Sequence, residues 1–267
     1  MKKEIISGLK WTYFGVILKF ISQLLIFSIL AHILAPEDFG VISMSFIFIN
    51  FALLLSQFGI GTALVQRKVL NKDHIKTGFT MAIFLGAFLF LAIYFSAPII
   101  SVFFSNSELV KILRTLALMF FFNGISMISR SLLQREMNFK DLMKIDIYSY
   151  FLGYGVIGII SALILKNVWA LVFATICQSF MDSVLSYWFR MFPVSLKIKK
   201  TEAIELLTFG GWFSIGGFFN YFAINGDNFI IGKYLGSVSL GIYSRAYTLM
   251  TLPAVYFASI FEKVFFP

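Results

Sequence analysis

The sequence predicts an all-α integral membrane protein of about eight transmembrane helices, in which a six-helix lobe precedes the first two helices of a parallel second lobe. Composition is the first reason. Of the 267 residues, 59% are hydrophobic and 13% are charged, whereas a soluble domain carries roughly 25% charged residues. Long uncharged runs are the second, because a helix needs about 20 apolar residues to cross a bilayer. A weak internal repeat is the third.

Apolar runs and the polar breaks between them set the predicted spans. The segments are far longer than the roughly ten-residue alternating strands of a membrane barrel. The eight spans, in order, are Trp11 to Leu34, Phe39 to Val65, Gly78 to Phe104, Val110 to Ile128, Ile145 to Leu165, Val168 to Phe189, Leu206 to Leu235 and Leu240 to Phe261.

Lysine and arginine residues gather in alternate connections between the spans. Those connections precede the first span, join the second to the third, join the fourth to the fifth, and join the sixth to the seventh. The other connections contain little more than Lys111 and Lys166. The positive-inside rule therefore places the amino terminus in the cytoplasm. It also accounts for the formal net charge of +9 without a nucleic-acid partner.

The repeat relates residues that lie 201 positions apart. It pairs Trp11 with Trp212 and Gly40 with Gly241, and so places the first span on the seventh. Six intervening spans give both copies the same orientation, as in transporters built from parallel repeats. We therefore expect a first lobe over residues 1–200 and the first two helices of an incomplete second lobe over residues 201–267. On this expectation the chain is the amino-terminal part of a longer transporter.

The same register places Asp227 opposite Ile26, and hence within the bilayer. The loop between the last two spans is then expected at Gly236 to Ser239.

Charged side chains inside predicted spans are the first candidates for function, because each costs roughly 2.5 to 3.5 kcal/mol at a helix centre unless it is paired or hydrated. Lys19, Asp182, Asp227 and Arg245 are such residues, and Lys19, Arg245 and Arg114 lie close enough to span ends to extend toward water. Asp182 also belongs to a polar stripe. The stripe contains Thr175, Gln178 and Ser186 at helical spacing and should face protein or water.

Uncharged polar residues form further stripes. Ser43, Asn50 and Gln57 follow one another at intervals of seven in the second span, and the repeat places Asn220 on Lys19. Two interpretations stand side by side: the stripes line a hydrated cavity, or they form hydrogen bonds from helix to helix.

Catalytic and redox chemistry find no support in the sequence. The single Cys177 allows no internal disulfide, and the patterns of metal hydrolases, serine hydrolases, P-loop proteins and D-x-D glycosyltransferases are absent. We therefore predict no catalytic residue, metal site or cofactor. The glycines at 153, 155 and 158 are expected to allow close helix packing rather than to form an ion filter.

Two segments resemble a known family. "ILAPEDFGVISM" (Ile33 to Met44) and "DNFIIGKYLGSVSLGIYSRAYTL" (Asp227 to Leu249) are similar to the Wzx-type polysaccharide flippases of the multidrug/oligosaccharidyl-lipid/polysaccharide exporter superfamily. The resemblance implies a protein of two six-helix lobes in the bacterial cytoplasmic membrane. It also implies a substrate, an undecaprenyl-diphosphate-linked oligosaccharide that is moved to the outer face. Membrane lipids, a polysaccharide polymerase and other assembly proteins are the implied partners.

The resemblance gives the candidate residues provisional roles. Lys19, Arg114 and Arg245 would neutralise the diphosphate. Asp182 and Asp227 would bind H⁺ or Na⁺ and couple transport to an ion gradient. The amide side chains would contact the sugar, and these are Asn50, Gln57, Gln178 and Asn220.

Three other functions stay open at this stage. A drug or organic-cation antiporter of the same superfamily would need an acidic, aromatic cavity. A membrane-bound polymerase or transferase would need a large outer loop, and the predicted outer loops are short. A non-transporting scaffold of polysaccharide assembly is the third alternative.

Overall fold

The computed structural model describes the backbone of residues 2–57, 59–67 and 69–265, and the side chains of residues 15–56, 59–67, 69–206 and 219–254. The described backbone is helical almost throughout and contains no strand. In chain order the elements are α1 (Lys2–Ile33), α2 (Pro36–Gln57), α3 (Ile60–Gln66), α4 (Lys72–Phe104), α5 (Leu109–Leu116), α6 (Met119–Arg135), α7 (Phe139–Tyr150), the π-helix η1 (Phe151–Gly158), α8 (Ile159–Leu165), α9 (Trp169–Phe189) and α10 (Lys200–Phe265).

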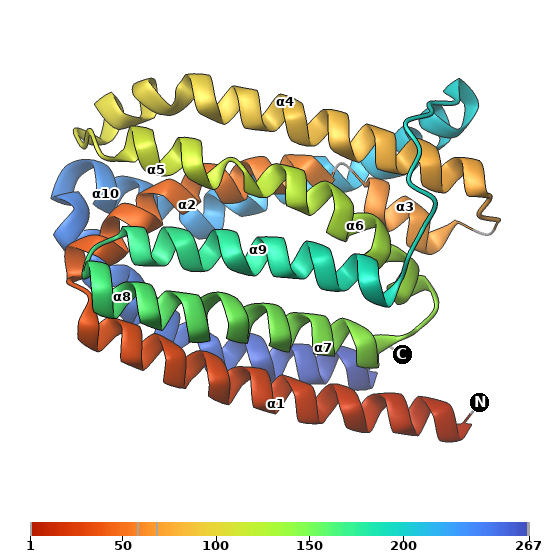
Figure 1. Ribbon diagram of the computed structural model, residues 1–267, viewed down its shortest axis with the longest axis horizontal. Coiled ribbons are helices and arrows are strands. Elements are labelled where there is room, and N and C mark those ends of the chain that lie inside the picture. Colours follow the sequence, from red (N-terminus) through yellow and green to blue (C-terminus); the bar gives the residue numbers. More distant parts are fainter. Residues whose placement is uncertain (1, 58, 68, 266–267) are drawn as a thin grey trace.

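The long helices lie side by side in one bundle (Figure 1). One end of the bundle, which we call the basic end, contains the start of α1 and the connections α3–α4, α6–α7 and α9–α10. The opposite end contains the short connections α1–α2, α4–α5 and α8–α9. There α10 also reverses at Gly236 (φ 80°, ψ −177°), so that its second half returns toward the basic end.

Six segments of the described chain are long and apolar enough to cross a membrane. They are Gly15–Ile33, Pro36–Ser56, Lys72–Phe104, Leu109–Arg135, Phe139–Leu165 and Trp169–Phe189. These segments confirm the predicted fold class and correspond to the first six predicted spans. The last two predicted spans form the two halves of α10, in which the side chains of residues 207–218 and 255–267 lie outside the described part.

Three predicted spans contain irregularities that hydropathy did not reveal. The second breaks at Gly59 (φ 67°, ψ 0°), after which the short α3 begins. The fourth is divided between α5 and α6, and the fifth passes through the π-helix η1. Hydropathy does not detect these breaks in the helical backbone, because apolar residues continue on both sides of them. The predicted loop at 236–239 is also shorter in the structure, where Gly236 is the non-helical residue.

Replacing Gly59 with alanine tests the first irregularity. The left-handed conformation costs a residue with a Cβ roughly 1 to 2 kcal/mol, so we expect Gly59→Ala to lower the free energy of unfolding by about 1 kcal/mol. The midpoint of unfolding by sodium dodecyl sulfate in mixed micelles measures this. Gly226→Ala is the control, because Gly226 is helical and a Cβ there would meet no atom within 4 Å. Equal midpoints for both variants would contradict the requirement for glycine at 59.

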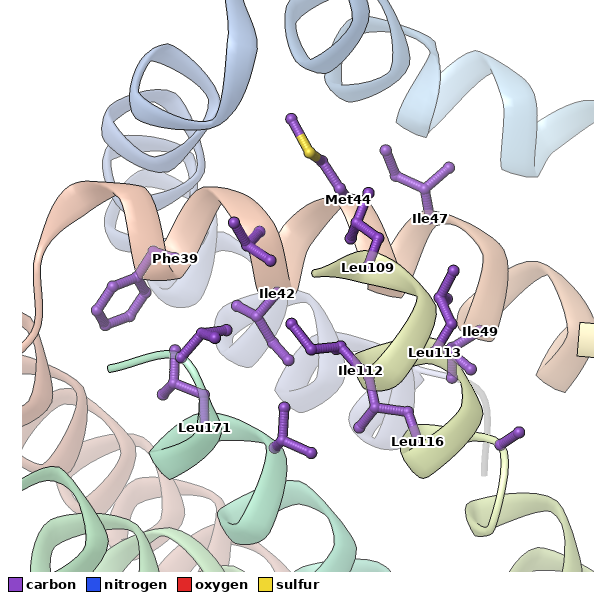
Figure 2. Close-up of a cluster of buried hydrophobic side chains, with 14 of the residues drawn as sticks. Phe39, Ile42, Met44, Ile47, Ile49, Leu109, Ile112, Leu113, Leu116 and Leu171 are labelled. Atoms are coloured by element: carbon purple, nitrogen blue, oxygen red, sulfur yellow. The ribbon is translucent and has the colours of Figure 1, made fainter. Parts of the chain in front are cut away.

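The larger hydrophobic core forms where α5 packs onto α2. Leu109, Ile112, Leu113 and Leu116 follow the i, i+3, i+4, i+7 pattern of a single helix face, and all four are completely buried. Figure 2 shows this face directed at α2, with Leu171 of α9 beside it. The short α5 is therefore held by its apolar face, although it is too short to be stable alone.

The segment between α9 and α10 is attached to the start of α4. The Lys199 amide donates to Thr77 Oγ1 at 3.3 Å, and the buried His74 lies 3.1 Å from Glu205 through Nε2. His74 Nδ1 accepts a hydrogen bond from the backbone amide of Asn71. The ring proton is therefore on Nε2, which donates to the Glu205 carboxylate. This hydrogen bond and the nearby Arg67 hold the pKa of Glu205 below its usual range.

Candidate functional site

A cavity of about 450 Å³, called here the larger cavity, opens among α1, α2, α7, η1, α9 and the second half of α10. Its lining mixes aromatic rings with hydroxyl, amide and ammonium groups. The lining residues are Lys19, Gln23, Phe27, Leu30, Phe39, Ile42, Ser43, Phe46, Tyr150, Tyr154, Leu171, Gln178, Ser244 and Thr248.

Two stacked tyrosines stand on one wall of the larger cavity. The rings of Tyr150 and Tyr154 are 5.2 Å apart between centroids and only 17° from parallel. The hydroxyl of Tyr154 lies 2.7 Å from Thr175 Oγ1 on α9. Close packing of η1 on α9 holds the wall together, because a Cβ on Gly153 would lie 2.7 Å from the backbone of Gln178. The predicted role of this glycine in helix packing is confirmed.

Four charged residues form a continuous chain of ion pairs, called here the charge chain. Lys19 Nζ lies 3.1 Å from Asp146, and Asp146 lies 2.6 Å from Arg130. Arg130 in turn lies 2.8 Å from Asp182. The four residues come from α1, α7, α6 and α9, and their charges alternate and cancel. Each charge therefore has a partner, which removes most of the cost of placing it inside the bundle.

A second cavity of about 310 Å³, called here the smaller cavity, lies among α3, α6 and α9. Arg130 and Asp182 are in its lining, whereas Lys19 lines the larger cavity. The charge chain thus runs from one cavity to the other. Gln178 and Asp182, one turn apart on α9, line the larger and the smaller cavity respectively.

The two copies of the internal repeat contact each other at the opposite end of the bundle. A Cβ on Gly40 would lie 1.8 Å from the carbonyl oxygen of Ser237, and a Cβ on Gly241 would lie 1.7 Å from that of Pro36. The offset of 201 converts Gly40 into Gly241 and Pro36 into Ser237. The two contacts are therefore one contact seen from both sides, as at a twofold interface.

The structure brings three of the predicted site residues to the cavities: Lys19 and Gln178 in the larger and Asp182 in the smaller. The Thr175–Ser186 stripe faces the bundle, and both of these residues are buried. Asn50 lies two turns along α2 from the cavity residue Ser43, and its side chain is exposed, as is that of Asn220. The side chain of Gln57 lies outside the described residues.

The other predicted residues have partners elsewhere. The Arg114 guanidinium is 4.3 Å from the centroid of the Tyr94 ring on α4. Arg245 lies 4.1 Å from the centroid of the Phe39 ring and donates to the Leu34 carbonyl at 2.8 Å, at the α1–α2 corner. Asp227 accepts hydrogen bonds from the Tyr243 hydroxyl and from the backbone amide of Asn228. None of the three lines either cavity.

Sequence reasoning missed both central members of the charge chain and the tyrosine wall. The predicted fourth span ends at Ile128 and leaves Arg130 in the basic connection that follows it, but α6 continues to Arg135 and contains Arg130. Asp146, Tyr150 and Tyr154 recur at intervals of four in an apolar segment. That spacing, typical of one helix face, is the signal that would have revealed them.

Comparison with known proteins places the chain in a family. The model of the family described as "Polysaccharide biosynthesis protein" matches residues 29–267. No solved structure gives a significant match.

Three curated relatives match almost the whole chain. The teichuronic acid biosynthesis protein TuaB of Bacillus subtilis (strain 168) is 29% identical, with 99% of this chain and 55% of the relative covered. The lipopolysaccharide biosynthesis protein WzxC of Escherichia coli (strain K12) is 24% identical, with 100% and 54% covered. The succinoglycan biosynthesis transport protein ExoT of Rhizobium meliloti (strain 1021) is 26% identical, with 90% and 48% covered.

The chain spans about half the length of these relatives. Their names agree with the resemblance to polysaccharide flippases that the two sequence motifs carried, and the family match confirms it. Since the match extends over far more than half of the residues, this chain belongs to the polysaccharide biosynthesis protein family.

Proposed function

We propose that the protein containing this chain moves lipid-linked oligosaccharide units across the bacterial cytoplasmic membrane during the synthesis of cell-surface polysaccharide. The observation that carries the proposal is the larger cavity, which combines an ammonium group, stacked tyrosines, hydroxyls and amides inside a bundle of apolar helices. The names of the relatives add support, since they include a polysaccharide transport protein.

The lining of the larger cavity suits the two parts of such a substrate. Buried polar groups lose several kcal/mol each without partners, so a glycan needs a polar path through the hydrocarbon layer. Ser43, Gln178 and Thr248 offer hydrogen bonds to sugar hydroxyls, and the flat tyrosine wall offers a surface for the apolar face of a sugar ring.

Lys19 is the proposed anchor of the diphosphate. Its side chain is one third exposed, and its ammonium is the one charged group in the described lining of the larger cavity. An arriving diphosphate would compete with Asp146 for this ammonium, while Asp146 would keep its second partner, Arg130. Among the described lining residues there is no carboxylate, which disfavours the alternative of an organic-cation antiporter.

Ion coupling and topology are further parts of the proposal. Binding of H⁺ or Na⁺ at Asp182 would weaken its pair with Arg130, and Asp227 would respond in the same way through Tyr243. The basic end would face the cytoplasm, together with the amino terminus. Residues 1–200 would form the first lobe and residues 201–267 the start of the second, and the reciprocal contact of Gly40 and Gly241 supports this division.

Replacement of Lys19 tests the proposal. In the whole protein, reconstituted in liposomes, we expect Lys19→Gln to reduce flipping of a fluorescent lipid-diphosphate oligosaccharide at least about tenfold, because a hydrogen bond to a charged group contributes about 1.5 to 3 kcal/mol. Lys111→Gln is the matched control, since Lys111 lies on α5 near the opposite end and lines neither cavity. Flipping by the Lys19 variant at the rate of the control would overturn the assigned role.

A further inference from the structure

The smaller cavity is far more polar than helix packing alone requires. Eight of the eleven lining residues that belong to the described part of the chain are polar or charged. Six of these carry amides or hydroxyls: Thr62, Gln66, Asn123, Ser126, Ser131 and Gln134. They come from two different helices, α3 and α6, and Asp182 of α9 lines the same cavity.

The amides in this lining are available to a ligand. The side chains of Gln66, Asn123 and Gln134 make no hydrogen bond to another residue whose side chain is described. An amide group offers two donors and an acceptor with two lone pairs. Three such groups around one space match a ligand that bears several hydroxyl groups, because each hydroxyl both donates and accepts.

The charges of the smaller cavity select an uncharged ligand. Arg130 is held between Asp182 and Asp146, at 2.8 and 2.6 Å, so its charge is already compensated. At the other end of the charge chain, Lys19 faces the larger cavity and shares its carboxylate partner, Asp146, with Arg130, so Lys19 is the cation more open to an anion. A phosphate group would therefore bind at Lys19 in the larger cavity, and the smaller cavity would take an uncharged group, in addition to the sugar contacts that the larger cavity offers.

Size and position limit the ligand to a single ring. A volume of about 310 Å³ is at the lower end of the roughly 300 to 1,000 Å³ of ligand pockets. Gln178 of the larger cavity and Asp182 of the smaller cavity are one helical turn apart on α9, a rise of about 5.4 Å. One molecule that carries a diphosphate and a sugar is thus within reach of both.

We propose that the smaller cavity binds one uncharged saccharide ring, through the amides of Gln66, Asn123 and Gln134. The inference rests on the proposed function, because it assigns the ring to the lipid-linked substrate. A free sugar would present the same chemistry, and the experiment separates the two sources.

Binding to the whole protein in lipid nanodiscs tests the proposal with three probes. The probes are methyl β-glucoside, inorganic pyrophosphate and a short-chain citronellyl diphosphate carrying one neutral sugar. Saturation-transfer NMR titrations measure binding of the glucoside, and calorimetry measures binding of pyrophosphate and of the citronellyl ligand. We expect Asn123→Leu and Gln134→Leu each to weaken glucoside binding at least about fivefold, since one neutral hydrogen bond is worth about that factor. Pyrophosphate binding should not change.

Lys19→Gln serves as the reciprocal control, because it should weaken pyrophosphate binding and leave glucoside binding intact. Both classes of variant should weaken the citronellyl ligand if the ring belongs to the lipid-linked substrate. If the amide variants weaken only the glucoside, the site serves a free sugar and the assignment to the substrate is overturned. Gln66 is exposed, so Gln66→Ala is a third amide variant that carries little risk to folding.

Absence of glucoside binding, or glucoside binding that all three amide variants leave unchanged, would overturn the saccharide site. That result would leave the proposed flipping activity intact, provided that Lys19→Gln still reduces transport. Loss of the proposed function would appear differently, as normal ligand binding without any flipping in liposomes.

Discussion

Replacing Arg130 with methionine is expected to lower the free energy of unfolding by about 3 kcal/mol, because removal of one partner of a buried ion pair typically costs 3 to 5 kcal/mol. Methionine keeps much of the volume of the side chain and removes its charge. Asp146 would keep Lys19 as a partner at 3.1 Å, whereas Asp182 would lose Arg130, its one ion-pair partner among the described residues. The side chains are about a third exposed or less, which places the expected cost at the lower end of the range.

A double-mutant cycle makes this prediction specific to the charge chain. Asp182→Asn should cost less in the Arg130→Met background than in the unmodified protein, because the carboxylate is then already without its partner. Unfolding in mixed micelles measures all four proteins. Additive effects of the two substitutions would show that Arg130 and Asp182 are not coupled, and unchanged stability of Arg130→Met would show that the ion pairs of Arg130 contribute nothing to the folded state.

A second large loss of stability is expected at the contact between the two copies of the repeat, near Gly40 and Gly241. Gly241→Ala would place a Cβ 1.7 Å from the carbonyl oxygen of Pro36, and neither backbone has a flexible side chain to move aside. The helices α2 and α10 must then separate at the opposite end. Overpacking usually costs about 1 to 3 kcal/mol, and we expect a loss of about 3 kcal/mol because both clashing groups are backbone atoms.

Because the contacts of Gly40 and Gly241 mirror each other, the cost of substituting both glycines can also be predicted. Gly40→Ala should cost about as much as Gly241→Ala, and the double variant should cost less than the sum, since one separation of the helices relieves both clashes. Gly78→Ala is the control, because a Cβ there would meet its neighbours at 3.6 Å or more. The midpoint of thermal unfolding in detergent measures these variants. A Gly241→Ala midpoint equal to that of Gly78→Ala would contradict the close contact.

Much of the architecture was predictable because the bilayer imposes a strong rule on sequence. A span must be long, apolar and helical, so the first six predicted spans correspond one to one to apolar helical segments of the structure, although their ends differ by up to nine residues, as at Ser56 against the predicted Val65. The internal repeat also indicated a contact, since its register pairs Gly40 with Gly241, and these two glycines lie at one contact in the folded protein.

The candidate site was predictable only in part. Lys19 and Asp182 were recognisable because an ionisable group in an apolar span requires a partner. The identity of the partners was not, since Lys19 meets Asp146 across 127 positions of the chain. Arg114 and Arg245 carried the same signal and turned out to lie against aromatic rings and backbone carbonyls outside both cavities.

The sequence by itself therefore determined a helical membrane protein, the places of its spans, and its relation to the polysaccharide flippases. Those features depend on the composition and order of local segments. Only the tertiary structure decided which polar residues meet in the two cavities and how the four charges connect them. Ion pairs and cavities depend on the rotation of each helix about its axis and on its neighbours, and packing between distant segments sets both.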